Sequence, residues 1–303
     1  MKKIFSLFLV LALLSGCSGS TVKRTQSLLG TTVEITVVDR DKPRRAIDRS
    51  IEKAFREIER IEQLLSRFRP GSDISRINVD AYLEPQKVAL ETIALIEKAI
   101  RFSQLSEGAF DITLERAGYR NIKILKQKQR VSFAKREMKL DLGGIAKGYA
   151  VDRAIEVLKQ EGIKCALVNA GGDIYGLGSR DRNSNWQVGL QHPRKKDVIL
   201  AVLELEDRAC ATSGDYECPD HIVNPKTGYP CQDTPASVTV LAKDCLSADA
   251  LATSVFVLGP TKGINLINQL EDTEAIVISI KEDARLDVLF SRGLKGKVKL
   301  NSE

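Results

Sequence analysis

One stretch near the start of this chain constrains its fold more than any other. Residues 44–66 carry large apolar side chains at intervals of three and four, namely Ile47, Ile51, Phe55, Ile58, Ile61 and Leu65. Because an α-helix turns about once every 3.6 residues, this spacing places all six side chains on one face. The stretch therefore predicts a long amphipathic helix, whose apolar stripe must be buried against other elements.

The remaining patterns predict helices and strands in irregular order. Further helices are expected at 88–105, Ala146–Glu161 and Ser247–Leu258, with a short helix at 74–78 that Ser72 or Asp73 can cap. Strands are expected at Thr31–Val38, 139–142, Cys165–Asn169, 186–191, 198–205, 236–242, 274–280 and 286–290. Because strands and helices do not alternate cleanly, the order favours an α+β fold over a doubly wound parallel sheet. No internal repeat or linker interrupts 29–303.

Composition and charge exclude several classes of protein. Of the 303 residues, 43% are hydrophobic and 28% charged, which excludes a disordered or collagen-like chain. The 46 Lys and Arg residues outnumber the 40 Asp and Glu residues, but the two kinds alternate, as in K-P-R-R-A-I-D-R-S-I-E-K from residue 42. A nucleic-acid-binding protein usually gathers its basic residues on one face or in one run. We therefore expect no nucleic-acid partner.

The first seventeen residues have the three parts of an export signal. Two lysines precede an apolar run at 4–14, which is shorter than the about 20 residues of a membrane-spanning helix. The run ends in L-S-G-C, which resembles the bacterial lipobox, whose cysteine is lipidated. We expect a signal peptide at 1–16, a lipidated Cys17 with a flexible tether at 17–28, and one domain at 29–303. An ordinary cleaved signal with a chance cysteine is the alternative.

Cysteine usage fits an exported protein without a thiol-based reaction. The chain has six cysteines and no C-x-x-C motif, which argues against thioredoxin-like chemistry and a cysteine-rich zinc site. With Cys17 lipidated, five remain, so at least one thiol has no partner within the chain. Cys218 and Cys231 flank a turn-rich segment and are the best disulfide candidates in an oxidising compartment. Buried free thiols are the alternative.

Familiar hydrolase and nucleotide-binding motifs are absent from the sequence. No G-x-S-x-G, H-E-x-x-H or G-x-x-x-x-G-K-[ST] occurs, and His192 and His221 are the two histidines. A hydrolytic triad would have to use one of these histidines, and nothing in the neighbouring sequence supports one. The candidate chemistry lies instead in glycine-rich turns and in polar side chains at the starts of helices.

Two glycine-rich turns can bring the backbone close to a ligand. Residues 141–152 read D-L-G-G-I-A-K-G-Y-A-V-D, with Gly143 and Gly144 at a turn between a strand and a helix. The helix N-terminus favours an anion and Lys147 adds a positive charge, so the segment suits a phosphate or a carboxylate. A second turn, A-G-G-D at 170–173, offers another close approach. A purely structural turn is the alternative for both.

Two further segments carry polar side chains in suggestive positions. In S-A-D-A-L-A-T from residue 247, Asp249 and Thr253 lie one helical turn apart, and a carboxylate with a hydroxyl suits a hard cation such as Mg²⁺. The alternative is an Asp249 that caps the helix and a Thr253 that bonds back to the backbone. In H-I-V-N-P-K-T-G from 221, His221 can accept a proton near neutral pH, or it is structural.

Together these segments resemble the ApbE family, the FAD:protein FMN transferases, which are usually exported bacterial lipoproteins. The motifs that carry the resemblance occur in order: Gly30-Thr31, G-A-F-D from 108, D-L-G-G-I-A-K-G-Y-A-V-D from 141, N-A-G-G-D from 169, A-T-S-G-D-Y from 211, H-I-V-N-P-K-T-G from 221 and A-D-A-L-A-T from 248. The resemblance implies a two-lobed α+β fold with FAD in the cleft between the lobes and Mg²⁺ on its pyrophosphate. It also implies transfer of FMN from FAD to a Thr or Ser hydroxyl of a partner flavoprotein, with release of AMP.

The resemblance also assigns roles to single residues. It places the cation site on Asp249, Thr253 and the carbonyl of Gly144. It places contacts to FAD on Leu29, Phe68, Ala109, Phe110, Asp111, Asp141, Lys147 and His221. The acceptor hydroxyl also needs a general base, for which His221 or a nearby Asp is the candidate. Two positions depart from the family pattern. Leu29 stands where the family often has Met, and Asn224 stands where it often has Asp.

The implied partners are FAD, an acceptor flavoprotein and a membrane. The family's usual acceptors are redox-pump subunits that face the periplasm, so we expect a bacterial lipoprotein anchored on that side. Two other functions use the same cofactor pocket. One is an FAD pyrophosphatase, in which water replaces the acceptor and the products are FMN and AMP. The other is a flavin-binding lipoprotein without catalytic activity.

Overall fold

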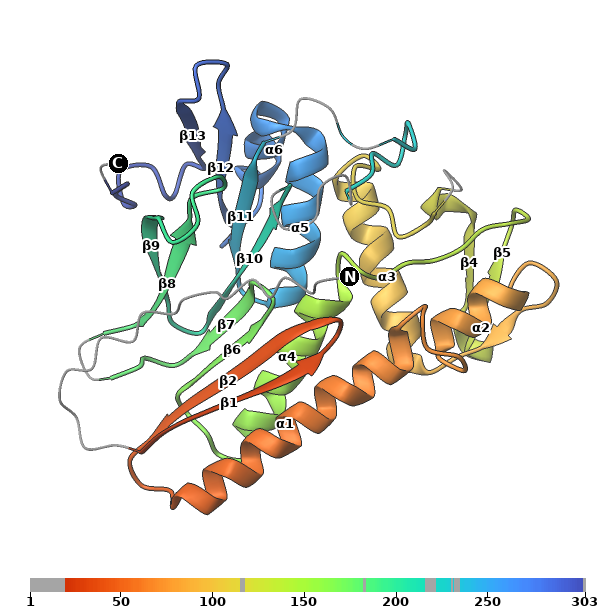
Figure 1. The fold of residues 1–303 in the computed structure, drawn as a ribbon. Coiled ribbons are helices and arrows are strands. Elements are labelled where there is room, and N and C mark those ends of the chain that lie inside the picture. Colours follow the sequence, from red (N-terminus) through yellow and green to blue (C-terminus); the bar gives the residue numbers. More distant parts are fainter. Residues whose placement is uncertain are drawn as a thin grey trace.

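An antiparallel eight-stranded sheet forms the centre of the molecule (Figure 1). The computed structural model describes residues 20–114, 118–181, 184–215, 222–229, 231 and 235–301. Neighbouring strands follow the order β1 (Ser20–Leu28), β2 (Thr31–Asp39), β6 (Ala166–Ala170), β7 (Asp173–Leu177), β10 (Arg208–Gly214), β11 (Ser237–Ala242), β12 (Glu274–Ile280) and β13 (Leu286–Phe290). Every adjacent pair is antiparallel, which confirms the predicted α+β class.

Three helices lie side by side on one face of this sheet. They are α1 (Arg44–Leu65), α4 (Ala146–Gln160) and α5 (Cys245–Leu258), and α4 lies between the other two (Figure 1). The short helix α6 (Pro260–Ile267) follows α5 and packs beside β12. The predicted long helix is confirmed as α1, whose buried residues include all six members of the apolar stripe.

The other face of the sheet is covered by a separate hairpin. Its strands are β8 (Trp186–Gln191) and β9 (Ile199–Leu205), and they enclose a second hydrophobic cluster against the central strands. Within β6, Val168 belongs to the helix-side cluster and Leu167 to the hairpin-side cluster. Because both faces are covered, the central strands β6 and β11 are buried along their whole length, including the polar residues Asn169, Ser237 and Thr239.

A smaller group of elements lies to one side of the main sheet. It contains α2 (Asp73–Asp80), α3 (Leu90–Leu105) and a three-stranded sheet of β3 (Gln86–Lys87), β5 (Arg130–Phe133) and β4 (Ile122–Leu125) (Figure 1). Two short 3₁₀ turns, Tyr119–Asn121 and Lys126–Lys128, flank β4. Ser72 caps α2 by accepting a hydrogen bond from the amide of Ser75, as the sequence predicted. The apolar residues of this group belong to the same cluster as the helix side of the main sheet.

The segment before residue 29 differs from the expected tether. Residues 20–28 form β1, which pairs along its whole length with β2, and Val22 is buried. The two strands are joined at Leu29 and Gly30, which have φ angles of 55° and 71°. Two successive left-handed residues form the tight turn that suits the twist of a hairpin. Part of the expected tether is therefore a strand, because cross-strand pairing with β2 orders residues 20–28.

Other differences concern elements without a strong local signal. Residues 139–142 were expected to form a strand, but Leu140 makes only an isolated bridge with Thr113. Helix α5 begins at Cys245, two residues before the expected start, and Asp244 is its N-cap through a bond from the amide of Ser247. The sequence patterns did not predict β1, β3, β4, β5, β7, β10 or α6. None of the described helices combines the length and apolar character needed to cross a membrane.

Candidate active site

Helices α4 and α5 touch at Gly148, in the first turn of α4. A Cβ atom at this position would lie 2.3 Å from the carbonyl oxygen of Cys245 and 2.9 Å from the Cβ of Asp249. Only glycine therefore allows this approach. The contact lets the amide of Gly148 donate a hydrogen bond to Oδ2 of Asp249 at 3.1 Å. Asp249 thus occupies the N-terminus of α4, where the helix has free amide groups.

Asp249 is not the cap of its own helix. It lies in the second turn of α5 and is buried, while Asp244 caps that helix. The alternative in which Asp249 is the N-cap of α5 is therefore excluded. Thr253 follows one turn later on the same helix.

Lys147 joins Asp249 to a second buried carboxylate. Its Nζ lies 2.8 Å from Oδ2 of Asp173 and 3.5 Å from Oδ1 of Asp249. Asp173 begins β7, directly after the turn at Gly171 and Gly172. The two carboxylate side chains are 3% and 5% exposed, whereas that of Lys147 is 31% exposed. We call Lys147, Asp173 and Asp249 the buried triad, and it meets solvent at its lysine.

The buried triad carries two carboxylates for one ammonium group. Burial, and next the charge of Asp249, raise the pKa of Asp173 well above its ordinary value. Burial by itself would lower the pKa of Lys147, but the charges of Asp173 and Asp249 outweigh it and raise that pKa. Lys147 therefore stays protonated. It faces two carboxyl groups, and a further cation beside them would relieve the repulsion from Asp249 that helps to raise the pKa of Asp173.

The third predicted cation ligand lies beside Thr253. A Cβ atom on Gly144 would lie 3.4 Å from Oγ1 of Thr253 and 3.3 Å from the ring of Phe110. The hydroxyl of Ser213, near the end of β10, is 3.4 Å from the same Oγ1. The fold thus gathers Gly144, Asp249 and Thr253 around the N-terminus of α4. Their oxygen atoms are the ligand type that Mg²⁺ prefers. Within the described ranges, no three His, Cys, Asp or Glu side chains form a metal-binding group of their own.

Asp141 forms a second polar point at the start of the same turn. Its Oδ1 accepts a bond from the amide of Gly143 at 2.9 Å, and its Oδ2 lies 2.7 Å from Nε of Arg67. The guanidinium of Arg67 stacks 4.1 Å from the ring centroid of Phe68, which is 75% exposed. An exposed aromatic ring next to a paired arginine is suited to stack against a planar ligand.

Leu29 is drawn toward this region by the hairpin turn. Its amide donates to Oε2 of Glu62 at 3.1 Å, and Oε1 of Glu62 pairs with Arg69 at 3.0 Å. On its other side, the hairpin reaches the turn that leads to Asp173, because a Cβ atom on Gly171 would lie 2.5 Å from Oγ1 of Thr31. Through Thr31, the hairpin that carries Leu29 therefore contacts the turn that precedes Asp173.

The G-A-F-D segment has a mainly internal role in this structure. Ala109 and Phe110 are buried, and the Phe110 ring packs edge-on against Phe102 with the ring centroids 6.4 Å apart. The oxygens of Asp111 accept bonds from the amide and hydroxyl of Thr113 and from the amide of Tyr119. Asp111 thus stabilises its own loop through hydrogen bonds, and the ring of Phe110 packs against Gly144.

Some predicted positions lie outside the described residues, namely Cys17, Cys218 and His221. The turn that follows His221 is described in part, and the Cε of Lys226 lies 3.9 Å from a Cβ atom built on Gly108. The H-I-V-N-P-K-T-G motif therefore approaches the G-A-F-D segment. Asn224 closes that turn through its Oδ1, which accepts the amide of Lys226. Cys231 is a free thiol, so the predicted disulfide to Cys218 is not formed in this structure.

The other histidine has a structural role. His192 is buried, and its Nδ1 accepts bonds from the amides of Arg194 and Lys195.

Three polar residues of the candidate site received no role from the sequence, namely Asp173, Arg67 and Ser213. The A-G-G-D motif contained a signal for Asp173, because its carboxylate directly follows a tight turn. Arg67 and Ser213 had no local signal.

Comparison with known proteins agrees with this arrangement. Residues 29–117 and 113–277 match the profile of the ApbE family. This chain belongs to the ApbE family. Residues 1–18 match the profile of prokaryotic membrane lipoprotein lipid attachment sites.

Two relatives with the same description are similar to this chain over most of their length. A Haemophilus influenzae protein described as FAD:protein FMN transferase is 28% identical, over 93% of this chain and 94% of its own. One of that description from Vibrio cholerae serotype O1 is 30% identical, over 84% and 87%. The solved structure of the flavin transferase ApbE from Vibrio cholerae has a TM-score of 0.82 at 27% identity. It covers 91% of this chain and 99% of that one.

Proposed function

We propose that this protein is an FAD:protein FMN transferase. It moves FMN from FAD to a Thr or Ser hydroxyl of a partner flavoprotein and releases AMP. The observation that carries the proposal is the convergence of Gly144, Lys147, Asp249 and Thr253 at one helix N-terminus, in a chain that belongs to the ApbE family. The relatives that bear the name of this activity support the same conclusion.

The proposed cation is Mg²⁺, held by Asp249, Thr253 and the carbonyl of Gly144. The fit rests on the donor set: one buried carboxylate, one hydroxyl and one carbonyl, with an excess of negative charge beside them. Hard oxygen donors in small number leave room for water and substrate phosphates, as is usual for Mg²⁺. The chemistry that a bound Mg²⁺ supplies is neutralisation of charge on the pyrophosphate oxygens.

The chain's own residues supply binding, charge and a proton acceptor. We assign Lys147 and the first amides of α4 to the FAD pyrophosphate, where charge grows as the bond to AMP breaks. The exposed ring of Phe68 is assigned to the flavin or adenine plane. In the transfer step the acceptor hydroxyl oxygen bonds to the FMN phosphorus, and the P–O bond to AMP breaks. The hydroxyl proton passes to a base, for which His221 is the candidate.

The proposed setting is the outer side of a bacterial membrane. The lipid attachment profile at 1–18 supports an exported protein with a lipid on Cys17. We assign the catalytic domain to the periplasm and the acceptor to a redox-pump subunit facing it. The acyl anchor would hold the enzyme near such membrane-bound acceptors.

One assay distinguishes the proposed function from its alternatives. The mature chain is incubated with FAD, Mg²⁺ and a candidate acceptor, and the products are analysed by mass spectrometry. Covalent FMN on the acceptor, with an equal amount of AMP, is the expected result. Free FMN and AMP with every acceptor tried would indicate a pyrophosphatase instead. Unchanged FAD bound to the protein would indicate a flavin-binding lipoprotein.

A further inference from the structure

Asp173 contributes to the candidate site in a way that the proposed metal ligands and FAD contacts do not include. It is 2% exposed, and its Oδ2 binds the ammonium group of Lys147 at 2.8 Å. The same ammonium group lies 3.5 Å from Oδ1 of Asp249, beyond the usual length of a charged hydrogen bond. Lys147 thus has two buried carboxylates within reach and binds the one that is not a proposed metal ligand.

The backbone holds Asp173 firmly in this position. It is the first residue of β7 and pairs with Ala170 across a tight turn. Gly171 and Gly172 in that turn have φ angles of 62° and 97°, which favour glycine at both positions. The amide of Gly172 donates to Oδ1 of Asn169 at 2.9 Å. A carboxylate on a strand end braced in this way is a fixed anchor for a flexible lysine side chain.

The carboxylate with which Lys147 pairs determines whether Asp249 can bind a cation. An ammonium group paired directly with Asp249 would compete with a divalent cation for that carboxylate. One paired with Asp173 leaves Oδ1 of Asp249 without a close ion pair and still supplies positive charge for a phosphate. Lys147 remains 31% exposed, so it can meet a ligand without leaving its anchor.

We propose that Asp173 is a positioning residue that holds Lys147 away from Asp249 and so keeps the Asp249 carboxylate available to a divalent cation. The proposal rests on the proposed function for the identity of the cation site. A general effect of charge would change cation affinity equally and in opposite directions when Asp173 or Lys147 is neutralised. The positioning role instead predicts a large change for Asp173 and a small one for Lys147.

The test measures binding of Mn²⁺, a paramagnetic substitute for Mg²⁺, by electron paramagnetic resonance. The mature chain is titrated alone and with FAD, without an acceptor. Four proteins are compared: wild type, Asp173→Asn, Lys147→Gln and the double variant. We expect Asp173→Asn to weaken Mn²⁺ binding about tenfold or more, because its freed lysine moves to Asp249. In the titration without FAD, Lys147→Gln should change binding less than about threefold, and the double variant should return to within about threefold of wild type.

A matched control separates this role from the loss of any buried carboxylate. Asp73 is 4% exposed and accepts bonds from the amide of Ala89 and the hydroxyl of Thr92, far from α4 in sequence and in a different helix. Asp73→Asn should leave Mn²⁺ affinity unchanged. Circular dichroism and thermal melts establish that each variant is folded. If Asp173→Asn does not fold, the Lys147→Gln measurement still decides, since a large gain in affinity would mean that Lys147 already blocks Asp249.

The outcomes also separate this proposal from the proposed function. Equal and opposite changes in Asp173→Asn and Lys147→Gln would mean that net charge alone acts, and would overturn the anchor role while leaving the cation site intact. Unaltered Mn²⁺ binding in Asp173→Asn would overturn it as well. A wild-type protein that binds no Mn²⁺, with or without FAD, would overturn both this proposal and the cation part of the proposed function.

Discussion

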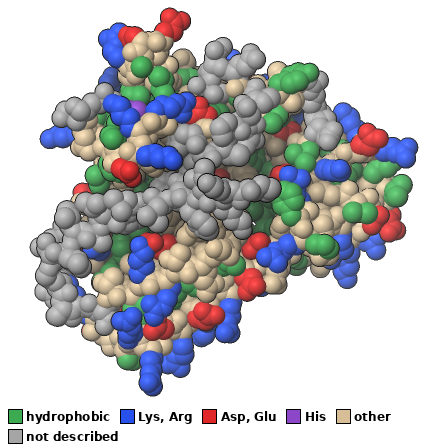
Figure 2. All heavy atoms as spheres, viewed as in Figure 1, with side chains coloured by type: hydrophobic (Ala, Val, Ile, Leu, Met, Phe, Trp, Pro, Cys, Tyr) green, Lys and Arg blue, Asp and Glu red, His purple; other side chains and the backbone are tan. Residues whose placement is uncertain are grey.

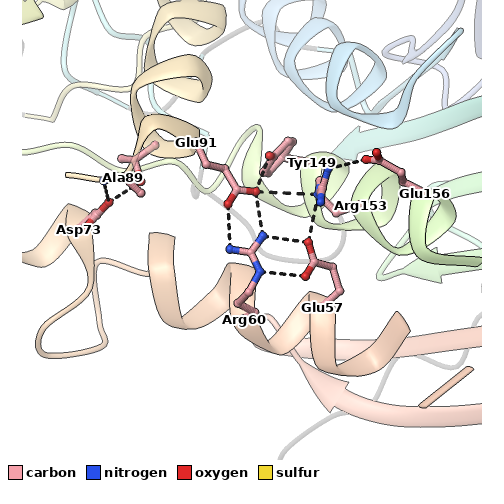
Figure 3. A network of polar contacts seen from close by, with 9 residues as sticks. Glu57, Arg60, Asp73, Ala89, Glu91, Tyr149, Arg153 and Glu156 are labelled. Atoms are coloured by element: carbon pink, nitrogen blue, oxygen red, sulfur yellow. Dashed lines mark hydrogen bonds and ion pairs between the residues drawn. The ribbon is translucent and has the colours of Figure 1, made fainter. Parts of the chain in front are cut away.

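Two clusters of charged side chains in this protein differ in how well their own residues pair their carboxylates. The first is the buried triad at the candidate site. The second joins α1, α3 and α4 and consists of Glu57, Arg60, Glu91, Tyr149, Arg153 and Glu156 (Figure 3). We call this second group the interhelical network. Both clusters include residues from α4, and their members are two to nine residues apart on that helix.

The interhelical network supplies donors for each of its acidic groups. Arg60 pairs with Glu57 and with Glu91, in each case at 2.8 Å, and Tyr149 donates to Glu91 at 2.6 Å. The hydrogen bond from Arg60 is the main cause of the lowered pKa of Glu57. For Glu91, burial would raise the pKa, but the bonds from Arg60 and Tyr149 outweigh it and lower that pKa. These carboxylates are therefore stable as anions.

The buried triad differs in the burial of its carboxylates and in the direction of the pKa change, although each cluster has one carboxylate more than it has cations. It has one cation for two carboxylates, and the pKa of Asp173 is raised, whereas those of Glu57 and Glu91 are lowered. A cluster in which every carboxylate has a hydrogen-bond donor of its own is a structural cluster. An excess of buried negative charge identifies a place where a ligand completes the pairing. Elsewhere, Lys and Arg are intermingled with Asp and Glu on the face in Figure 2, which matches the alternation in the sequence.

The strongest test of the comparison removes the excess charge at the site. We expect Asp249→Ala to lower the rate of FMN transfer at least about a hundredfold, because the cation site loses its one carboxylate ligand. Transfer rate against Mg²⁺ concentration measures the effect, with thermal melts alongside. Asp244→Ala is the matched control: it removes the cap of α5, costs about 1 kcal/mol of stability and should leave transfer near normal. Near-normal transfer by a folded Asp249→Ala protein would contradict the assignment.

A second test concerns Asp152, which lies on α4 next to Arg153 and contacts the start of α5. Its carboxylate accepts the amides of Cys245 and Leu246 at the start of α5, yet burial raises its pKa from 3.8 to about 7. The folded state therefore holds this proton more tightly than the unfolded state, so stability should fall as pH rises from about 4 to 7. Between pH 5 and 8, wild type should lose on the order of 2 kcal/mol more than Asp152→Asn in urea unfolding. Equal losses would contradict the role of Asp152.

A milder change at the site tests the neutral ligand. Thr253→Val keeps the shape of the side chain but removes the hydroxyl that lies next to Gly144 and Ser213. We expect transfer to fall about tenfold, because water can replace a neutral ligand but not a carboxylate. Raising the Mg²⁺ concentration should recover part of the rate. Ser213→Ala tests the neighbouring hydroxyl and should have a smaller effect. A loss for Thr253→Val as large as that for Asp249→Ala would contradict this order.

The smallest effect is expected in the interhelical network. Arg60→Ala removes the donor shared by Glu57 and Glu91 and should lower stability by about 1 kcal/mol, since the 44% exposure of Arg60 allows water to replace part of the pairing. Transfer per folded molecule should stay within about twofold, because this group completes no ligand site. Arg56→Ala, a more exposed arginine of the same helix, serves as control and should change neither quantity. A large loss of transfer for Arg60→Ala would remove the contrast between the clusters.

Much of this fold could be predicted from local patterns. The apolar stripe of α1, the cap of α2 at Ser72 and the strand pair at 274–280 and 286–290 all carried signals within a few residues of sequence. Strands β7 and β10 escaped prediction because buried residues lie on both of their faces, so no alternation marks them. Strand β1 escaped because its order comes from pairing with β2.

The sequence by itself determined the family of this protein and the residue types at its site, because those lie in short motifs with fixed spacing. It also placed Asp249 and Thr253 on one helix face, since a helix imposes that geometry. Only the tertiary structure decided that Asp249 meets α4 at Gly148 and that Lys147 binds Asp173 more closely than Asp249. The contact between Gly148 and Asp249 joins residues 101 positions apart. Charge balance at such a point depends on the packing of helices and strands against one another, which no local pattern encodes.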